Sequence, residues 1–166
     1  MNFPNLINHV GDYSFKGFIY QHKEKGGADE PSWAGTLVFR GTRIARVQYA
    51  ATTGEFDIDP IDESAYEDFL TFAVEWAAEA CTDLPTRDEA GFCLLSHLAD
   101  IAYHLRRLEV ISQRSATFQL RSDPPERYRY LRNSPLTPAV AAQLRTTYGD
   151  DLACILREDE LGSLAA

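Results

Sequence analysis

Residues 87–112 read RDEAGFCLLSHLADIAYHLRRLEVIS, and the other elements of the chain are arranged around this segment in the predicted fold. Thr86 and Glu89 match the Ser/Thr-x-x-Glu capping box that opens many helices. Asp88 lies in the first turn and Arg106 near the end, where each charge suits the helix dipole. The pattern predicts one helix of roughly 39 Å, at 1.5 Å per residue.

The apolar side chains of this helix fall on two sides at 100° per residue. One broad face contains Leu94, Leu95, Leu98, Ile101, Ala102, Leu105 and Leu108. The nearly opposite side contains Phe92, Tyr103 and Val110. We therefore expect a central helix that the protein core covers on the first side and a second layer or a partner covers on the other. A homodimer through Phe92, Tyr103 and Val110 is one interpretation of the second side.

The first sixty residues favour short strands. Aromatic and β-branched residues alternate there with polar ones, and Gly41-Thr42 joins two such segments in a clear hairpin signal. We expect an antiparallel β-meander with strands at 13–20, 34–40, 43–50 and 55–59.

The remaining elements follow from capping and turn residues. Ser64 and Glu67 form a second capping box and open a helix through Cys81. Residues 115–121 favour a strand, and Thr137-Pro138 opens a helix that ends at Gly149. The segment 151–158 is ambiguous between strand and helix, and 159–166 should be frayed.

The prediction is thus an α+β protein in which the N-terminal meander packs on a long central helix, with two or three further helices. We expect one domain over 1–166, because this length supports one ordinary core. Its parts are the meander at 1–60, two helices at 61–112, and a strand plus a C-terminal helical region with a frayed tail at 113–166.

Cysteine content and hydropathy favour the cytoplasm. The chain has no signal-peptide pattern and no run of 18 apolar residues, so we expect a soluble protein. An odd number of cysteines, at positions 81, 93 and 154, suits buried free thiols in a reducing compartment better than disulfides.

The net charge of −9 is unevenly distributed. Residues 1–54 contribute +2, residues 55–100 contribute −12, residues 101–132 contribute +4 and residues 133–166 contribute −3. Acidic proteins repel nucleic acid and anionic membranes, so direct binding to either is disfavoured. The natural partner of the acidic segment is a basic protein or a nucleoprotein complex.

The acidic segment is the favoured candidate for a partner-binding surface. Its selected carboxylates lie at Asp57, Asp59, Asp62, Glu63, Glu67, Asp68, Glu75 and Glu79. Such a concentration costs stability through self-repulsion, and mimicry of a DNA phosphate ladder would explain it. A merely solvated acidic face is the alternative interpretation.

The central helix also offers a metal-binding alternative. Cys93, His97, Asp100 and His104 fall within about 60° of one another at helical spacing, and these are ligand types that zinc uses. The segment contains no HExxH motif, and the chain contains no GxSxG motif. We therefore favour a non-enzymatic protein without a cofactor. A metal-dependent enzyme that uses these four residues, or an oligomeric regulatory module, remains the alternative.

A basic and aromatic stretch follows at residues 121–132. Its arginines lie on one face and its tyrosines on the other if the stretch is extended. This composition occurs where proteins stack on single-stranded nucleic acid. The arginines can instead pair with the acidic segment, and the net charge favours this second interpretation.

The hairpin TLVFRGTRIARVQYA at residues 36–50 carries the pattern FxGxxIAxV. It resembles a hairpin of small accessory proteins of phages and plasmids. Those proteins often continue with a Gly-Gly turn, whereas this chain continues with AATTGEFDID. The resemblance implies a mobile-element protein that binds a host factor, as inhibitors of CRISPR and restriction systems do.

Overall fold

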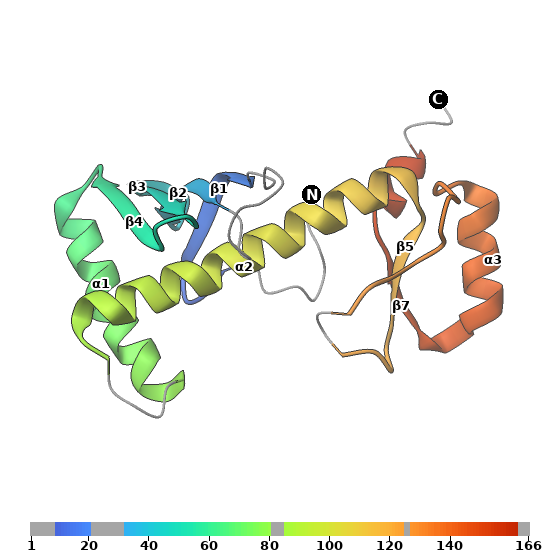
Figure 1. Cartoon of the computed structure of the whole chain (residues 1–166). Coiled ribbons are helices and arrows are strands. Elements are labelled where there is room, and N and C mark those ends of the chain that lie inside the picture. Colours follow the sequence, from blue (N-terminus) through green and yellow to red (C-terminus); the bar gives the residue numbers. More distant parts are fainter. Residues whose placement is uncertain (1–8, 21–31, 81–84, 125–126, 163–166) are drawn as a thin grey trace. The chain divides into compact units, whose positions relative to one another are not determined.

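The computed structural model describes residues 9–20, 32–80, 85–124 and 127–162 (Figure 1). Backbone contacts divide the chain into two compact units at the boundary between Tyr103 and His104. We call the described residues up to Tyr103 the N-terminal unit and those from His104 the C-terminal unit. Whether the chain folds as the single domain expected from the sequence depends on whether either unit can fold alone. The division into units does not test this, and the single domain stays a prediction.

The N-terminal unit contains a four-stranded antiparallel sheet in the order β1-β2-β3-β4. Its strands are β1 (Tyr13–Tyr20), β2 (Trp33–Phe39), β3 (Thr42–Ala50) and β4 (Glu55–Pro60). Each strand pairs with the next one along the chain, which confirms the predicted meander.

The turn between β2 and β3 explains the glycine at its centre. Arg40 and Gly41 both have positive φ angles, of 49° and 86°. Two-residue hairpin loops favour this backbone because its twist matches that of the strands. The Arg40 side chain also donates from Nε to Asp12 Oδ2 at 2.8 Å, which ties the turn to the start of β1.

One face of the sheet builds the core of this unit. Ala45 and Val47 of β3 are buried, whereas Arg46 between them is exposed, as the alternation of a strand requires. Helix α1 (Glu63–Ala80) and the first part of helix α2 (Arg87–Arg114) supply the other half of the core. Figure 1 shows both helices beside the sheet.

Helix α1 begins earlier than the sequence predicts. Asp62 caps it, because Asp62 Oδ1 accepts a hydrogen bond from the Ala65 backbone N–H at 3.0 Å. The predicted capping box at Ser64 is therefore wrong. An aspartate is as good an N-cap as a serine, and Asp62 is the first capping residue after β4. Phe69, Ala73 and Ala77 form the buried side of α1.

Helix α2 confirms the capping box predicted at its start. The Thr86 backbone N–H donates to Glu89 Oε2 at 2.8 Å, and the Glu89 N–H donates back to Thr86 Oγ1 at 3.4 Å. The Thr86 hydroxyl and N–H together hold the pKa of Glu89 below its usual value. Leu94, Leu95 and Leu98 are fully buried in the core.

The C-terminal unit contains a small three-stranded sheet in the order β6-β5-β7. The strands are β5 (Thr117–Leu120), β6 (Arg129–Tyr130) and β7 (Leu152–Ile155), and the helices are α3 (Pro138–Tyr148) and the short 3-10 elements η1 (Gly149–Asp151) and η2 (Glu158–Gly162). Thr137 caps α3 as predicted, because its Oγ1 accepts from the Val140 N–H at 3.3 Å. The ambiguous segment 151–158 contains strand β7.

A second core lies inside this unit. Phe118, Leu120, Leu144 and Ile155 are buried in it, so α3 packs with the three-stranded sheet. Residues 159–162 belong to η2 and residues 163–166 lie outside the described residues, so the expected frayed tail stays a prediction.

The chain is thus an α+β protein, with one four-stranded antiparallel sheet followed by helices and a small second sheet. Beside α2, the described ranges hold two further α-helices, α1 and α3. None of the helices described here is both long and apolar enough to cross a membrane.

Candidate interaction surface

Strand β4 places its carboxylates on the outer face of the sheet. Phe56 and Ile58 pack against the core, so Asp57 and Asp59, which alternate with them, point the other way and are exposed. Asp59 forms an ion pair with Arg46 of β3, with Oδ2 at 2.8 Å from Nη1. Helix α1 packs on the opposite face of this sheet.

Helix α1 gathers a separate set of carboxylates. Asp68, Glu75 and Glu79 are exposed and lie seven and four residues apart, so they share one stripe of the helix. This stripe is opposite the buried side that contains Phe69 and Ala73. We call Asp68, Glu75 and Glu79 the acidic stripe.

The other carboxylates of the predicted surface lie to either side. Glu63 and Glu67 are exposed in the first part of α1, and Asp62 is committed to the helix cap. Glu67 forms an ion pair with Arg87 of α2, with Oε2 at 2.6 Å from Nη2. The eight carboxylates therefore do not form one continuous surface. Asp57 and Asp59 face outward from the sheet, whereas the acidic stripe faces outward from α1.

The carboxylates of the acidic stripe have no basic partner among the described residues. Asp68, Glu75 and Glu79 make no ion pair in this part of the chain, and neither do Asp57 and Glu63, whereas Asp59 and Glu67 each make one. Because no cation in this part of the chain neutralises these charges, they remain available to a basic group on another molecule.

The metal-binding alternative is not assembled. Among the described residues, no three His, Cys, Asp or Glu side chains lie close enough together to hold a metal ion. Cys93 and His104 are eleven residues apart on α2, which is about 16 Å along the axis at 1.5 Å per residue. The His97 ring stacks on Trp76 at 5.5 Å between centroids. Asp100 is exposed on the same helix.

The cysteines also differ from their predicted burial. Cys93 is exposed, so the expectation of a buried thiol is wrong there. Cys154 is half-buried, and burial raises the pKa of its thiol. Cys81 lies outside the described residues.

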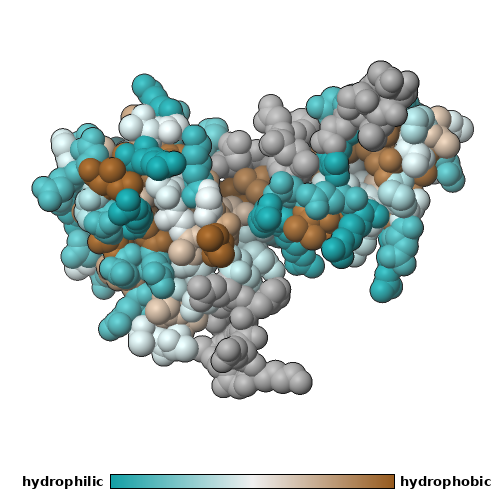
Figure 2. Space-filling view, turned by 90° about the horizontal axis from the view of Figure 1, so that it is seen from above, coloured by the Kyte–Doolittle hydropathy of each residue, from teal (hydrophilic) through white to brown (hydrophobic). Residues whose placement is uncertain are grey.

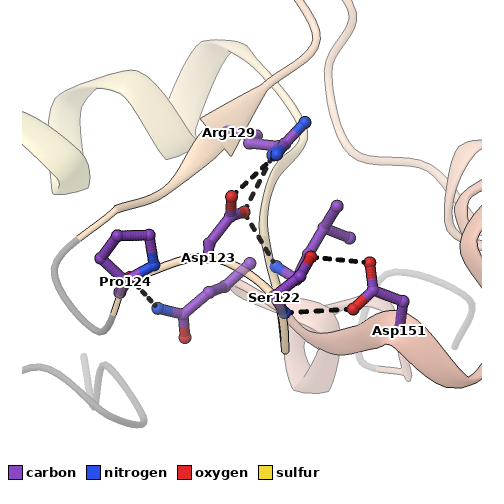
Figure 3. Close-up of polar contacts among 7 residues, drawn as sticks. Ser122, Asp123, Pro124, Arg129 and Asp151 are labelled. Carbon is purple, nitrogen blue, oxygen red and sulfur yellow. Dashed lines mark hydrogen bonds and ion pairs between the residues drawn. The ribbon is translucent and has the colours of Figure 1, made fainter.

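Two arginines of residues 121–132, Arg121 and Arg129, pair locally. Arg129 donates from Nε and Nη2 to the two carboxylate oxygens of Asp123, each at 2.8 Å (Figure 3). The Arg121 guanidinium donates from Nε to the Asp150 carbonyl at 2.9 Å. Their partners thus lie in the C-terminal unit and outside the acidic segment.

Three further hydrogen bonds hold the same turn. The Ser122 hydroxyl donates to Asp151 Oδ2 at 2.9 Å, and its N–H donates to Oδ1 at 3.1 Å (Figure 3). The Leu120 N–H donates to Asp123 Oδ2 at 3.3 Å. Asp123 therefore holds the turn after β5 together, which gives its carboxylate a structural role.

The Asp123 carboxyl should titrate below the ordinary aspartate range. The hydrogen bonds from Arg129 and the Leu120 N–H lower its pKa in the folded protein. Its contribution to stability is therefore full above the unfolded pKa of about 3.9 and is lost as the pH falls through the folded value. We expect an NMR titration of the Leu120 amide to show the lowered pKa, and Arg129→Gln to return it toward the ordinary value. An unchanged pKa in Arg129→Gln would contradict this role for Arg129.

A cavity of about 340 Å³ lies within the C-terminal unit. It is lined by His104, Arg107, Leu108, Ile111, Pro124, Arg127, Tyr128 and Tyr130. An extended stretch would place the arginines and tyrosines on opposite faces, but strand β6 covers only Arg129 and Tyr130. Arg127, Tyr128 and Tyr130 line the same cavity, so an arginine and two tyrosines of this stretch lie close together. Burial raises the pKa of Tyr128 to about 12, so its hydroxyl is protonated at neutral pH.

The proposed dimer side of α2 is used partly within the molecule. Phe92 stacks on Phe56 at 4.9 Å, and Tyr103 stacks on Tyr20 at 4.4 Å. Val110 is 42% exposed in the C-terminal unit. On the face drawn in Figure 2, the hydrophobic residues form several separate groups among hydrophilic ones. A dimer through these three residues stays a prediction.

A second cavity, which was not predicted from the sequence, lies within the N-terminal unit. It has a volume of about 420 Å³ and is lined mostly by aromatic side chains from all four strands and from α2, together with Asp100. The sequence contains one indication of this cavity. Phe18 and Tyr20 are two residues apart in β1, and the two-residue period of a strand places their side chains on the same face. Strand register was needed to bring Trp33, Tyr49 and Phe56 beside them.

Comparisons with known proteins found no relative of this chain: no family model, no curated protein and no solved structure matches it. The function of this protein is therefore inferred from the geometry of the described residues.

Proposed function

We propose that this protein is a non-enzymatic binding protein that docks on a basic protein or nucleoprotein complex through α1. One observation carries the proposal: Asp68, Glu75 and Glu79 share an exposed stripe and have no ion-pair partner among the described residues. The resemblance of the β2–β3 hairpin to mobile-element proteins supports a host nucleic-acid-binding target in the cytoplasm. Occupation of that target's basic groove would inhibit it.

The spacing of the acidic stripe suits contacts with several cations at once. Along α1, Asp68 and Glu75 are about 10 Å apart and Glu75 and Glu79 about 6 Å apart, at 1.5 Å per residue. Lysine and arginine side chains that bind successive phosphates can reach carboxylates at such separations. Complementary charge of this kind raises the association rate and makes binding sensitive to salt.

Binding in the nucleic-acid-binding groove of the partner predicts competition with DNA, whereas charge attraction elsewhere on the partner does not. Tagged protein should capture a basic partner from nuclease-treated host lysate at low salt and lose it at high salt. Once that partner is purified, duplex DNA should compete with this protein for it, because both would occupy one groove. A partner that binds DNA and this protein simultaneously would overturn the mimicry.

A further inference from the structure

Four aromatic residues form one row across the whole sheet of the N-terminal unit. In the strand register, Tyr20 of β1 lies opposite Trp33 of β2, Trp33 lies opposite Tyr49 of β3, and Tyr49 lies opposite Phe56 of β4. Directly opposed residues share a face, so all four side chains point to the side where α2 packs. The row is a continuous aromatic surface on the face of the sheet that is directed toward α2.

Helix α2 touches this row at both ends. Phe92 stacks on Phe56, with ring centroids 4.9 Å apart, and Tyr103 stacks on Tyr20, with centroids 4.4 Å apart. Eleven residues of helix span about 16 Å, and three strand spacings span about 14 Å, so the two contacts match a helix that crosses the strands.

Small side chains leave a space between the two stacked pairs. Ser96 and Ala99 lie between Phe92 and Tyr103 on α2, and neither is large enough to fill the gap above Trp33. The resulting cavity of about 420 Å³ is lined by Phe18, Tyr20, Trp33, Tyr49, Gly54, Phe56, Ser96, Ala99, Asp100 and Tyr103.

The chemistry of the lining selects one kind of ligand. The faces of aromatic rings carry negative electrostatic potential and attract cations, most strongly in the case of tryptophan. Asp100 adds a carboxylate, and none of the described residues that line the cavity is basic. Asp100 also contributes to the raised pKa of Tyr20, after burial and Tyr103, which places its charge near the row.

We propose that this cavity binds an organic cation whose ammonium group carries alkyl substituents. The alkyl groups would contact the aromatic rings, and the positive charge would face Trp33 and Asp100. An unalkylated ammonium is more strongly hydrated and gains less from an apolar cavity. The site is independent of the proposed function, because none of the eight carboxylates of the acidic surface lines the cavity.

Tryptophan fluorescence offers a direct test, because the chain has two tryptophans and only Trp33 lines the cavity. In a Trp76→Phe background, choline should change the Trp33 emission saturably at constant ionic strength. The neutral analogue 3,3-dimethylbutanol has the same shape without the charge. We expect choline to bind at least about tenfold more tightly than this analogue, as cation–π contacts and one carboxylate require. Equal affinities would overturn the cation assignment, and no binding by either compound would overturn the site.

Two pairs of variants locate the binding. Ser96→Phe should fill the cavity and abolish the choline response, whereas Ser96→Ala should retain it. Ser96 is exposed at the helix surface, so both variants should fold. Asp100→Asn should weaken choline binding by about threefold to tenfold, whereas Asp88→Asn, an exposed carboxylate on the same helix outside the cavity, should not change it. Full binding in Ser96→Phe would place the cation elsewhere and overturn the proposal.

The same titration distinguishes two sources of the cation. A free metabolite with an alkylated ammonium group and a methylated lysine side chain of a partner protein share this chemistry. Tighter binding of a trimethyllysine peptide than of free trimethyllysine would identify a partner side chain. Equal or tighter binding of the free compound would identify a small molecule, and binding of unmodified lysine peptide with equal affinity would overturn the requirement for alkylation.

Discussion

Reversal of Asp68, Glu75 and Glu79 to lysine should strongly weaken binding of the proposed basic partner. All three are exposed on one stripe of α1 and make no ion pair in the described part of the chain, so the substitutions should not break internal contacts. Each reversal replaces an attraction with a repulsion at the interface. Close interfacial charge pairs couple by about 1.5–7 kcal/mol, so we expect the three together to weaken binding at least about a hundredfold. Calorimetry with the purified partner measures the loss.

A control of equal charge separates position from net charge. Reversal of Glu55, Asp150 and Asp159 to lysine changes the net charge by the same amount at exposed positions outside α1. We expect this variant to retain most of the affinity. If both triple variants lost binding equally, the partner would be responding to overall charge rather than to the acidic stripe, and the docking site on α1 would be wrong.

Phe69→Ala should produce the largest loss of stability in the N-terminal unit. Phe69 is fully buried, and its ring lies 5.2 Å from Tyr13 and 5.8 Å from Tyr66. Truncation would remove these contacts and leave a cavity between α1 and the sheet. Phenylalanine-to-alanine changes in cores cost about 3–5 kcal/mol, so the midpoint of urea unfolding should fall markedly.

Tryptophan fluorescence reports this unfolding, because Trp33 and Trp76 both lie in the N-terminal unit. Val74→Ala provides the control on the same helix, since Val74 is 37% exposed and its truncation leaves no buried cavity. We expect a loss below about 1 kcal/mol for it. A loss for Phe69→Ala no larger than for Val74→Ala would mean that α1 does not pack on the sheet as described.

Local signals in the sequence identified most elements. The capping box at Thr86 and Glu89, the Gly41 hairpin and the Thr137-Pro138 helix start all depend on residues close together along the chain. The same kind of signal failed at Ser64, because Asp62 is an equally good cap two residues earlier and the end of β4 leaves it free to start the helix. Segment 151–158 was ambiguous because its strand depends on pairing with β5, which is distant in sequence.

The candidate sites divide in the same way. The acidic stripe follows from helical spacing alone, so Asp68, Glu75 and Glu79 were identifiable from their positions. The angular positions of Cys93 and His104 around the helix also place them in one stripe. Angular position does not include the rise along the helix axis, and this rise separates the two residues too far for one metal ion.

The α+β class, the meander and the acidic stripe can be predicted from the amino-acid sequence, because each depends on short-range periodicity and on local hydrogen bonds. The three-dimensional structure was needed to show that Asp57 and Asp59 face away from α1, and that Tyr20, Trp33, Tyr49 and Phe56 form one row under α2. These arrangements depend on strand register and on which face of the sheet the helices bury. Register and packing join residues far apart along the chain, and no local pattern encodes them.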